Sequence, residues 1–234
     1  MIVQVRWMRT FSIVLSLLFL PVVHKLFSQE YKYEIGAATG ISSYMGDANR
    51  TRFFLHPKIA GGALFRYNIN LQWAIKANIL GGSISANTAY SGNRFPAEQK
   101  ETFQRSFADI GSQIEFHFFR YSSEYGYLGA RPYTPYLFIG IGATVATGEK
   151  PFYGVNMPIG IGFKYKLKNR INIGTEISTR KLFRDNFDVT KQTQGWSLDA
   201  PFGIESSLLK NQDWYSFAVI YFTWDFGLRE DPCR

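Results

Sequence analysis

Apolar and polar residues alternate with a period of two along much of this chain, and the clearest stretch is residues 157–180. Every odd position from Ile159 to Leu167 is apolar, whereas the even positions between them hold glycine and lysine. The same alternation resumes at Ile171. Period two is typical of strands with two unlike faces. Because only residues 168–170 separate the two arms, the pattern predicts an antiparallel hairpin with one apolar face and one face of glycine and charge.

The alternation recurs in six further segments, so we expect eight strands. Each is about ten residues long, which is enough to cross an apolar layer when the strand is tilted. An even number of antiparallel strands closes into a barrel without a free edge. The sequence therefore predicts an all-β fold, an eight-stranded antiparallel up-and-down transmembrane β-barrel of the outer-membrane type. The expected strands occupy residues 31–41, 57–67, 71–81, 105–119, 133–147, 157–167, 171–180 and 213–226.

The links expected at one end of the strands are long, and those at the other end are shorter. Outer-membrane barrels have long extracellular loops and short periplasmic turns. We therefore expect the odd-numbered links on the outside, and both termini in the periplasm of a Gram-negative bacterium. The expected long links are 42–56, 82–104, 148–156 and 181–212, and the shorter ones are 68–70, 120–132 and 168–170.

Period two alone does not say which face is inside, because a soluble lipocalin-like barrel would bury the apolar face. Two features favour lipid on the outside. The polar face is rich in glycine, which suits a narrow, filled interior. Aromatic residues gather near the strand ends, where membrane proteins carry aromatic belts. Examples are Tyr31, Tyr33, Trp73, Trp224 and Phe226. The expected surroundings of the apolar face are therefore outer-membrane lipids.

The polar faces should then line the interior. Unpaired charge is costly in a narrow lumen, so we expect an ion-pair and hydrogen-bond network that fills it. Eight strands leave no open channel once side chains fill the interior, so a plugged barrel is predicted and not a porin. Lys58 and Lys166 also fall on this face. The predicted lumen network comprises Lys32, Glu34, Arg66, Lys76, Asp109, Glu115, His117, Lys164, Glu176, Arg180 and Asp225.

Residues 1–28 have the pattern of a secretory signal, with a cationic start, a short apolar middle and Ser28 before the expected cleavage. The alternative is an uncleaved N-terminal anchor. We expect a barrel over residues 29–227 and a short periplasmic tail over 228–234. Cleavage would remove three cations and no acid, so the formal charge would fall from +8 to +5. The cations are not clustered, so no nucleic-acid partner is expected.

The sequence offers little for catalysis. His56 and His117 have no serine or aspartate partner at a recognisable spacing, and there is no metal-binding cluster, phosphate loop or nucleophile elbow. We therefore expect no enzyme activity, no cofactor and no metal. A hydrolase with its site in the loops is the alternative. Cys233 is the only cysteine. It forms either an intermolecular disulfide or an unpaired thiol.

Several stretches, in order along nearly the whole expected mature chain, resemble the PorG-type outer-membrane barrels of the type IX secretion system. They are residues 44–47, 62–68, 115–119, 134–138, 213–215, 226–227 and 232–233. The chain departs from that family in lacking a further cysteine in the tail, and residues 183–189 match only loosely.

The resemblance implies a non-enzymatic accessory role in which the barrel anchors a periplasmic ring to the outer membrane. The implied partners are the ring subunits, a PorK-like lipoprotein and a PorN-like protein. The contact surface would be periplasmic and would include Arg120, Tyr125, Tyr127, Arg131 and Cys233. Aromatic and arginine side chains are common at interfaces. An ordinary turn with an interfacial aromatic belt is the alternative reading of that link. A general barrel that serves adhesion or membrane integrity through its outer loops is the alternative function.

Overall fold

The structure of this protein is a computed structural model. It describes residues 31–45, 56–87, 102–122, 129–148, 151–168, 170–184, 187 and 213–228. The expected signal at 1–28, Tyr125, Tyr127 and Cys233 lie outside these described residues. Within them, no helix has both the length and the apolar character needed to cross a membrane.

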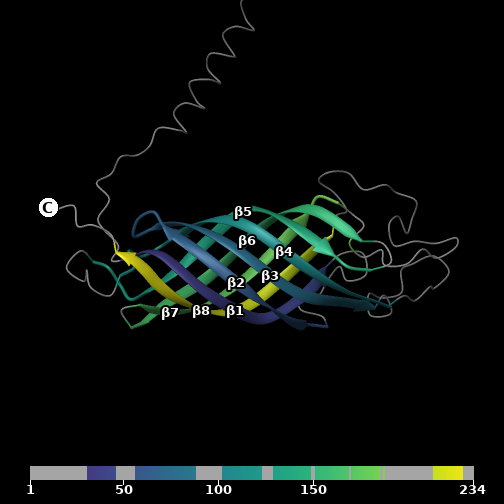
Figure 1. Cartoon of the computed structure of the whole chain (residues 1–234), viewed down its shortest axis with the longest axis horizontal. Coiled ribbons are helices and arrows are strands. Elements are labelled where there is room, and N and C mark those ends of the chain that lie inside the picture. The colour runs from purple at the N-terminus through teal and green to yellow at the C-terminus, as the bar shows by residue number, and fades with distance from the viewer. Residues whose placement is uncertain are drawn as a thin grey trace, which may run out of the picture.

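The described strands form one closed, antiparallel, up-and-down barrel in which every strand pairs with its neighbour in sequence (Figure 1). The first and last strands also pair, from Tyr31 opposite Leu228 to Met45 opposite Trp214, and this pairing closes the sheet. The fold class predicted from the alternation is therefore confirmed. The strands are β1 (Tyr31–Met45), β2 (Lys58–Asn68), β3 (Trp73–Asn87), β4 (Thr102–His117), β5 (Tyr133–Ala146), β6 (Phe152–Lys168), β7 (Ile171–Leu182) and β8 (Trp214–Leu228).

The two faces of the sheet are inverted relative to a soluble barrel. Large apolar side chains point outward along every strand, as with Ile59, which is 84% exposed, and Ile141, which is 65% exposed. Charged side chains between them, such as Arg66 and Glu115, are 0% exposed. An exterior this apolar is stable only in contact with lipid, because water would leave a continuous oily belt unfavourably hydrated. The barrel therefore crosses a membrane.

Aromatic side chains form a belt on the outside at the end where the chain enters β1 and leaves β8, here called the turn end. The ring of Tyr33 lies within 6 Å of those of Phe65, Tyr67 and Phe226. Trp73 and Phe116 pack 4.9 Å apart on the next pair of strands. Such belts mark the level of the lipid headgroups.

Several strands are longer than the sequence pattern predicted, chiefly at the opposite end, here called the loop end. The expected loop at 148–156 is wrong, because β6 already begins at Phe152. Gly154 and Asn156 resemble turn residues, but Tyr153 and Val155 point outward while Phe152 and Asn156 are buried. The alternation of faces therefore continues through them. The fifth link is consequently short, so only the first, third and seventh links at this end are long.

β1 and β3 are also longer than expected. Residues 42–45 were expected to begin a loop, yet β1 continues to Met45 and buries Ser42, Ser43 and Tyr44. β3 continues from 81 to Asn87, paired with β4 from Thr102. Small polar residues such as Ser83 resemble loop residues in sequence. Here they pair across strands, with Ser83 Oγ 3.1 Å from Ser106 Oγ.

Tyr31 was expected on the lipid-facing side and is instead buried, so that prediction is wrong. Arg170 Nε donates a hydrogen bond to the Tyr31 hydroxyl over 3.1 Å, and the guanidinium of Arg170 lies 5.2 Å from the Tyr31 ring. These contacts hold the ring at the mouth of the barrel. Gly227, which lies between Leu228 opposite Tyr31 and Phe226 opposite Tyr33, has a φ of +71°, a backbone conformation that favours glycine.

Two inward glycines make room for tyrosines on neighbouring strands. Gly162 pairs with Tyr136, and a Cβ built on this glycine would lie 2.3 Å from the Tyr136 Cζ. Gly174 pairs with Tyr221, and its Cβ would lie 2.3 Å from the Tyr221 Cζ. Each tyrosine therefore lies flat across a glycine and extends its hydroxyl into the centre of the barrel.

Candidate functional site

The centre of the barrel holds a cluster built around Arg66 on β2. Arg66 Nη1 donates to Glu34 Oε2 over 2.6 Å, and Arg66 Nε donates to Glu115 Oε2 over the same distance. Arg66 Nη2 also reaches Glu115 Oε1 at 3.2 Å, so that pair is bidentate. The guanidinium faces the ring of Tyr221 at 5.3 Å. Arginine is suited to this place because its planar fork binds two carboxylates in fixed directions.

Two lysines complete this cluster. Lys76 Nζ lies 2.6 Å from Glu176 Oε1 and 3.1 Å from Glu115 Oε1. Lys164 pairs with Glu34 from the opposite side of the lumen. The Tyr136 hydroxyl donates to Glu176 over 2.6 Å. Three cations and three glutamates therefore neutralise one another where a single unpaired charge would be strongly disfavoured.

His117, the last residue of β4, lies on the turn-end side of this cluster and is fully buried. Its Nε2 is 3.5 Å from Glu115 Oε2, and neither ring nitrogen has a hydrogen-bond partner among the described residues. The expected hydrogen bond to a lumen partner is therefore not formed. The imidazole instead packs edge-on against the rings of Tyr136, at 5.5 Å, and Tyr121, at 6.1 Å.

A second cluster lies toward the loop end, around Asp109 on β4. Arg180 Nε donates to Asp109 Oδ1 over 2.9 Å. The Asn156 amide and the Tyr215 hydroxyl each donate to Asp109 Oδ2 over 2.6 Å. Thr144 Oγ1 lies 2.7 Å from the Tyr215 hydroxyl. Both carboxylate oxygens of Asp109 are thus occupied, so Asp109 has the contacts of a structural acceptor and not those of a free base.

A third cluster closes the turn end. Lys166 Nζ lies 3.1 Å from Asp225 Oδ2, and Asn172 Nδ2 donates to Asp225 Oδ1 over 2.5 Å. Tyr121, from the link after β4, enters the mouth and donates to Asn172 Oδ1 over 2.5 Å. Burial raises the pKa of Tyr121 well above its ordinary value, so this hydroxyl stays protonated to a higher pH than that of a free tyrosine.

A cavity of about 10 Å³ remains beside this cluster, with Glu34, Asn68, Tyr121, Lys166 and Asp225 among its walls. Asn68 Oδ1 is buried and has no hydrogen-bond partner among the described residues. A space of this size holds about one water molecule and no larger ligand.

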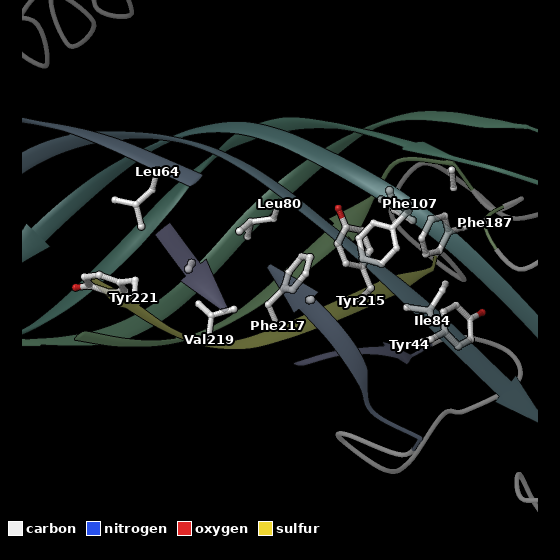
Figure 2. Close-up of a cluster of buried hydrophobic side chains, with 14 of the residues drawn as sticks. Tyr44, Leu64, Leu80, Ile84, Phe107, Phe187, Tyr215, Phe217, Val219 and Tyr221 are labelled. Carbon is white, nitrogen blue, oxygen red and sulfur yellow. The ribbon is translucent and has the colours of Figure 1, made fainter. Parts of the chain in front are cut away.

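Aromatic side chains fill the loop end of the lumen, and one of them comes from the link after β7. Phe187 is fully buried, with its ring 5.8 Å from that of Phe107 and 5.4 Å from that of Tyr215 (Figure 2). Its backbone is held at both polar atoms, because its N–H donates to Asp213 Oδ2 and its carbonyl accepts from Arg105 Nη1. The Tyr44 hydroxyl donates to Asp213 Oδ1 over 2.5 Å.

The buried charges of the described interior are therefore balanced. Among the described residues, the buried cations and the buried carboxylates each number six. The cations are Arg66, Lys76, Arg105, Lys164, Lys166 and Arg180, and the carboxylates are Glu34, Asp109, Glu115, Glu176, Asp213 and Asp225. Tyr121 and Phe187 occupy the two mouths. The described residues hold no group of three or more metal-ligating side chains that could bind an ion.

The structure brings together most of the lumen residues expected from sequence. Glu34, Arg66, Lys76, Glu115, Lys164 and Glu176 meet in the central cluster, Asp109 and Arg180 in the second, and Asp225 at the turn end. Lys32 is half-buried and forms no ion pair within the described part of the chain, and Lys58 is likewise half-buried. Arg120 and Arg131 are exposed at the turn end.

Sequence reasoning missed the uncharged partners of these clusters. Asn68, Asn156 and Asn172 all donate to buried carboxylates. Asn156 was assigned to a loop. Tyr121 and Phe187 were assigned to links, and nothing in their sequence context shows that a link folds back into the barrel. The one usable signal was the alternation of faces. Asn172 is separated from Glu176 and Arg180 by even numbers of positions, so it lies on the same face of the strand.

Comparisons with solved structures found small barrels of low sequence identity. Neisserial surface protein A has 8% identity and a TM-score of 0.48, with 83% of this chain and 97% of that chain covered. Ail of Yersinia pestis has 9% identity and a TM-score of 0.46, with 85% of this chain and 100% of that chain covered. The outer membrane protein OprG of Pseudomonas aeruginosa has 10% identity and a TM-score of 0.44, with 86% of this chain and 98% of that chain covered.

No curated protein matches the sequence. A family profile matches residues 9–234, which is nearly the whole chain. By this match the chain belongs to the family described as Domain of unknown function (DUF6089).

Proposed function

We propose that this protein is a non-enzymatic barrel of the outer membrane of a Gram-negative bacterium, with both termini in the periplasm. The observation that carries the proposal is the inverted arrangement of faces, with an apolar exterior and a charge-balanced interior. Exported barrels with this arrangement belong to outer membranes. The signal-like pattern of residues 1–28 agrees with export.

The contacts of the interior argue against catalysis. A catalytic carboxylate needs a free face toward substrate and access from the solvent. The carboxylate oxygens of Glu34, Glu115 and Asp109 instead accept hydrogen bonds within ion pairs, and all three side chains are buried. Among the described residues, the link-borne Tyr121 and Phe187 lie buried at the two mouths. These contacts support a structural role for the lumen.

We further infer a role as an accessory, anchoring component of the type IX secretion system that links a periplasmic ring to the outer membrane. The support is the resemblance to PorG-type barrels, whose stretches recur here in order along the chain. Residues from different stretches also meet inside the barrel. Tyr44 bonds to Asp213, and Arg66 bonds to Glu115. The partners would be a PorK-like lipoprotein and a PorN-like protein.

The partner surface would lie at the turn end, which faces the periplasm in this orientation. Arg120 and Arg131 are exposed there, and the Arg131 carbonyl accepts from the Ser122 N–H over 3.1 Å. Tyr125, Tyr127 and Cys233, which lie outside the described residues, complete the proposed contact set. Exposed arginine beside aromatic residues is the composition favoured at protein interfaces.

The test is co-purification from cells under mild detergent. The tagged barrel should retain the ring subunits, and Arg120→Gln should weaken that retention. Arg184→Gln, an exposed arginine at the opposite end, is the matched control and should retain them. Deletion of the gene should abolish type IX secretion. Absence of ring subunits together with intact secretion would reject the anchoring role and favour a barrel for adhesion or membrane integrity that works through its outer loops.

A further inference from the structure

Three exposed cations lie at neighbouring backbone positions of the turn-end rim, from the start of β5 to the start of β7. They are Arg131, Lys168 and Arg170, here called the basic arc. The Lys166 N–H donates to the Pro132 carbonyl, which places Arg131 next to the end of β6. Lys168 pairs with Ile171, which places Arg170 in the turn beside it. Neighbouring strands are about 4.8 Å apart, so the backbone positions of the basic arc span about 10 Å.

Aromatic and aliphatic side chains lie directly on the membrane side of the basic arc. The Arg131 guanidinium lies 4.5 Å from the Phe119 ring and 5.9 Å from that of Tyr133. Tyr165, Leu167 and Tyr133 are exposed on the outer face immediately beyond it. This belt fixes the arc at the level of the lipid headgroups, because aromatic rings of this kind settle at the membrane–water boundary.

Among the described residues, the exposed charges at this rim are all positive. Within the described residues, no exposed carboxylate lies at the turn end, since Asp225 is buried against Lys166. Arg120 is also exposed there and Lys32 is half-exposed, so the described part of the rim carries positive charge. A positive rim at headgroup level attracts anionic lipid.

We propose that the basic arc binds the phosphate headgroups of anionic phospholipids in the leaflet at the turn end. Arg131 presents N–H donors in a fixed fork and is held in place by two rings, which suits phosphate recognition. Lys168 and Arg170 are exposed and add positive charge at the same rim. Bound headgroups would hold the barrel at a fixed depth and orientation beneath the proposed ring contact.

The experiment is native mass spectrometry of the full barrel after exchange into equal amounts of phosphatidylglycerol and phosphatidylcholine. The wild type should retain phosphatidylglycerol preferentially. The triple variant Arg131→Gln/Lys168→Gln/Arg170→Gln should lose that preference by about fivefold for each cation removed. Because Arg170 also holds Tyr31, the double variant Arg131→Gln/Lys168→Gln keeps that contact and should show a proportionate loss.

The matched control removes the same charge from the loop end, with Lys58→Gln/Lys181→Gln/Arg184→Gln. It should keep the preference for phosphatidylglycerol. Equal losses in both triple variants would show an effect of net charge alone and would overturn the proposal. An unchanged preference in the basic-arc variants would also overturn it. Loss of ring subunits by the same variants in the separate co-purification test would then identify the arc as a protein contact. The assay contains no ring subunits, so its result is independent of the anchoring role. Retention of neither lipid by the wild type would likewise overturn the proposal.

Discussion

At the scale of single residues, the interior is stable only because each charge has a partner. Arg66 is the clearest case, since it bonds to Glu34 and Glu115 and is fully buried. Burying these groups is costly on its own, and only their mutual pairing offsets that cost. Removing one member should therefore harm the fold more than removing a matched pair.

Arg66→Met tests this point. It leaves three glutamates facing two lysines, so the free energy of unfolding should fall by about 3–5 kcal/mol, the usual cost of leaving a buried charge unpaired. The measurement is urea unfolding of the barrel in lipid vesicles. Arg66→Met/Glu115→Gln, which restores the balance, should recover part of the loss. If the single variant were as stable as the wild type, the paired network would not be what stabilises the lumen.

Gly174→Ala should be destabilising for a steric reason. The added Cβ would meet the Tyr221 ring at 2.3 Å and displace it from the centre of the lumen. Overpacking of this kind typically costs about 1–3 kcal/mol. Gly81→Ala is the matched control, because the nearest atom to its Cβ would be 3.8 Å away. Thermal unfolding in detergent should separate the two variants, and equal midpoints would contradict the packing argument.

At the scale of elements, links as well as strands build the interior. The link after β4 delivers Tyr121 to one mouth, and the link after β7 delivers Phe187 to the other. Phe187 packs on Phe107 and Tyr215 and is fixed through its backbone by Asp213 and Arg105. It therefore ties the seventh link to β4 and β8.

Phe187→Ala should lower the free energy of unfolding by about 3–5 kcal/mol, the range observed for large aromatic truncations in packed cores. The comparison is Phe118→Ala, which removes a ring that is half exposed on the outer face. In lipid vesicles that ring contacts acyl chains in the folded barrel, so its loss should cost much less. Similar urea midpoints for the two variants would show that Phe187 is not anchored in the lumen.

At the scale of the whole molecule, the outward position of the apolar face determines both the surroundings of the barrel and the polar character of its interior. Ile139 at the middle of β5 is 50% exposed, and inward neighbours such as Phe138 are buried. The same division holds around the closed sheet. In a membrane this apolar exterior is removed from water, and its transfer from water into lipid lowers the free energy of the folded barrel.

A thiol scan tests the location of the apolar face. In a Cys233→Ser background, Ile139→Cys should resist a charged thiol reagent in intact vesicles and react after unfolding in urea. Arg184→Cys, at the exposed loop end, should react in both states. Rapid labelling of Ile139→Cys in intact vesicles would place that face in water.

Some errors of sequence reasoning had a common cause. Residues such as Ser42, Ser83, Gly154 and Asn156 look like loop residues, and the strands that contain them were predicted too short. In a barrel of this kind the inward face is polar by necessity and the strands extend beyond the apolar layer. Polar composition therefore does not mark the end of a strand here. The end of a strand is marked by the loss of cross-strand pairing, which a single sequence does not show.

The alternation alone determined the all-β class, the number of strands and the two faces of nearly every strand, because period two is a local property of the backbone. Which lumen charges meet was decided only by the closed sheet, since Glu34 and Lys164 are brought together across the barrel and not along the chain. The inward turn of Tyr31 and the insertion of Tyr121 and Phe187 also depend on closure. Such contacts join residues distant in sequence, and their energies exist only after the strands have paired.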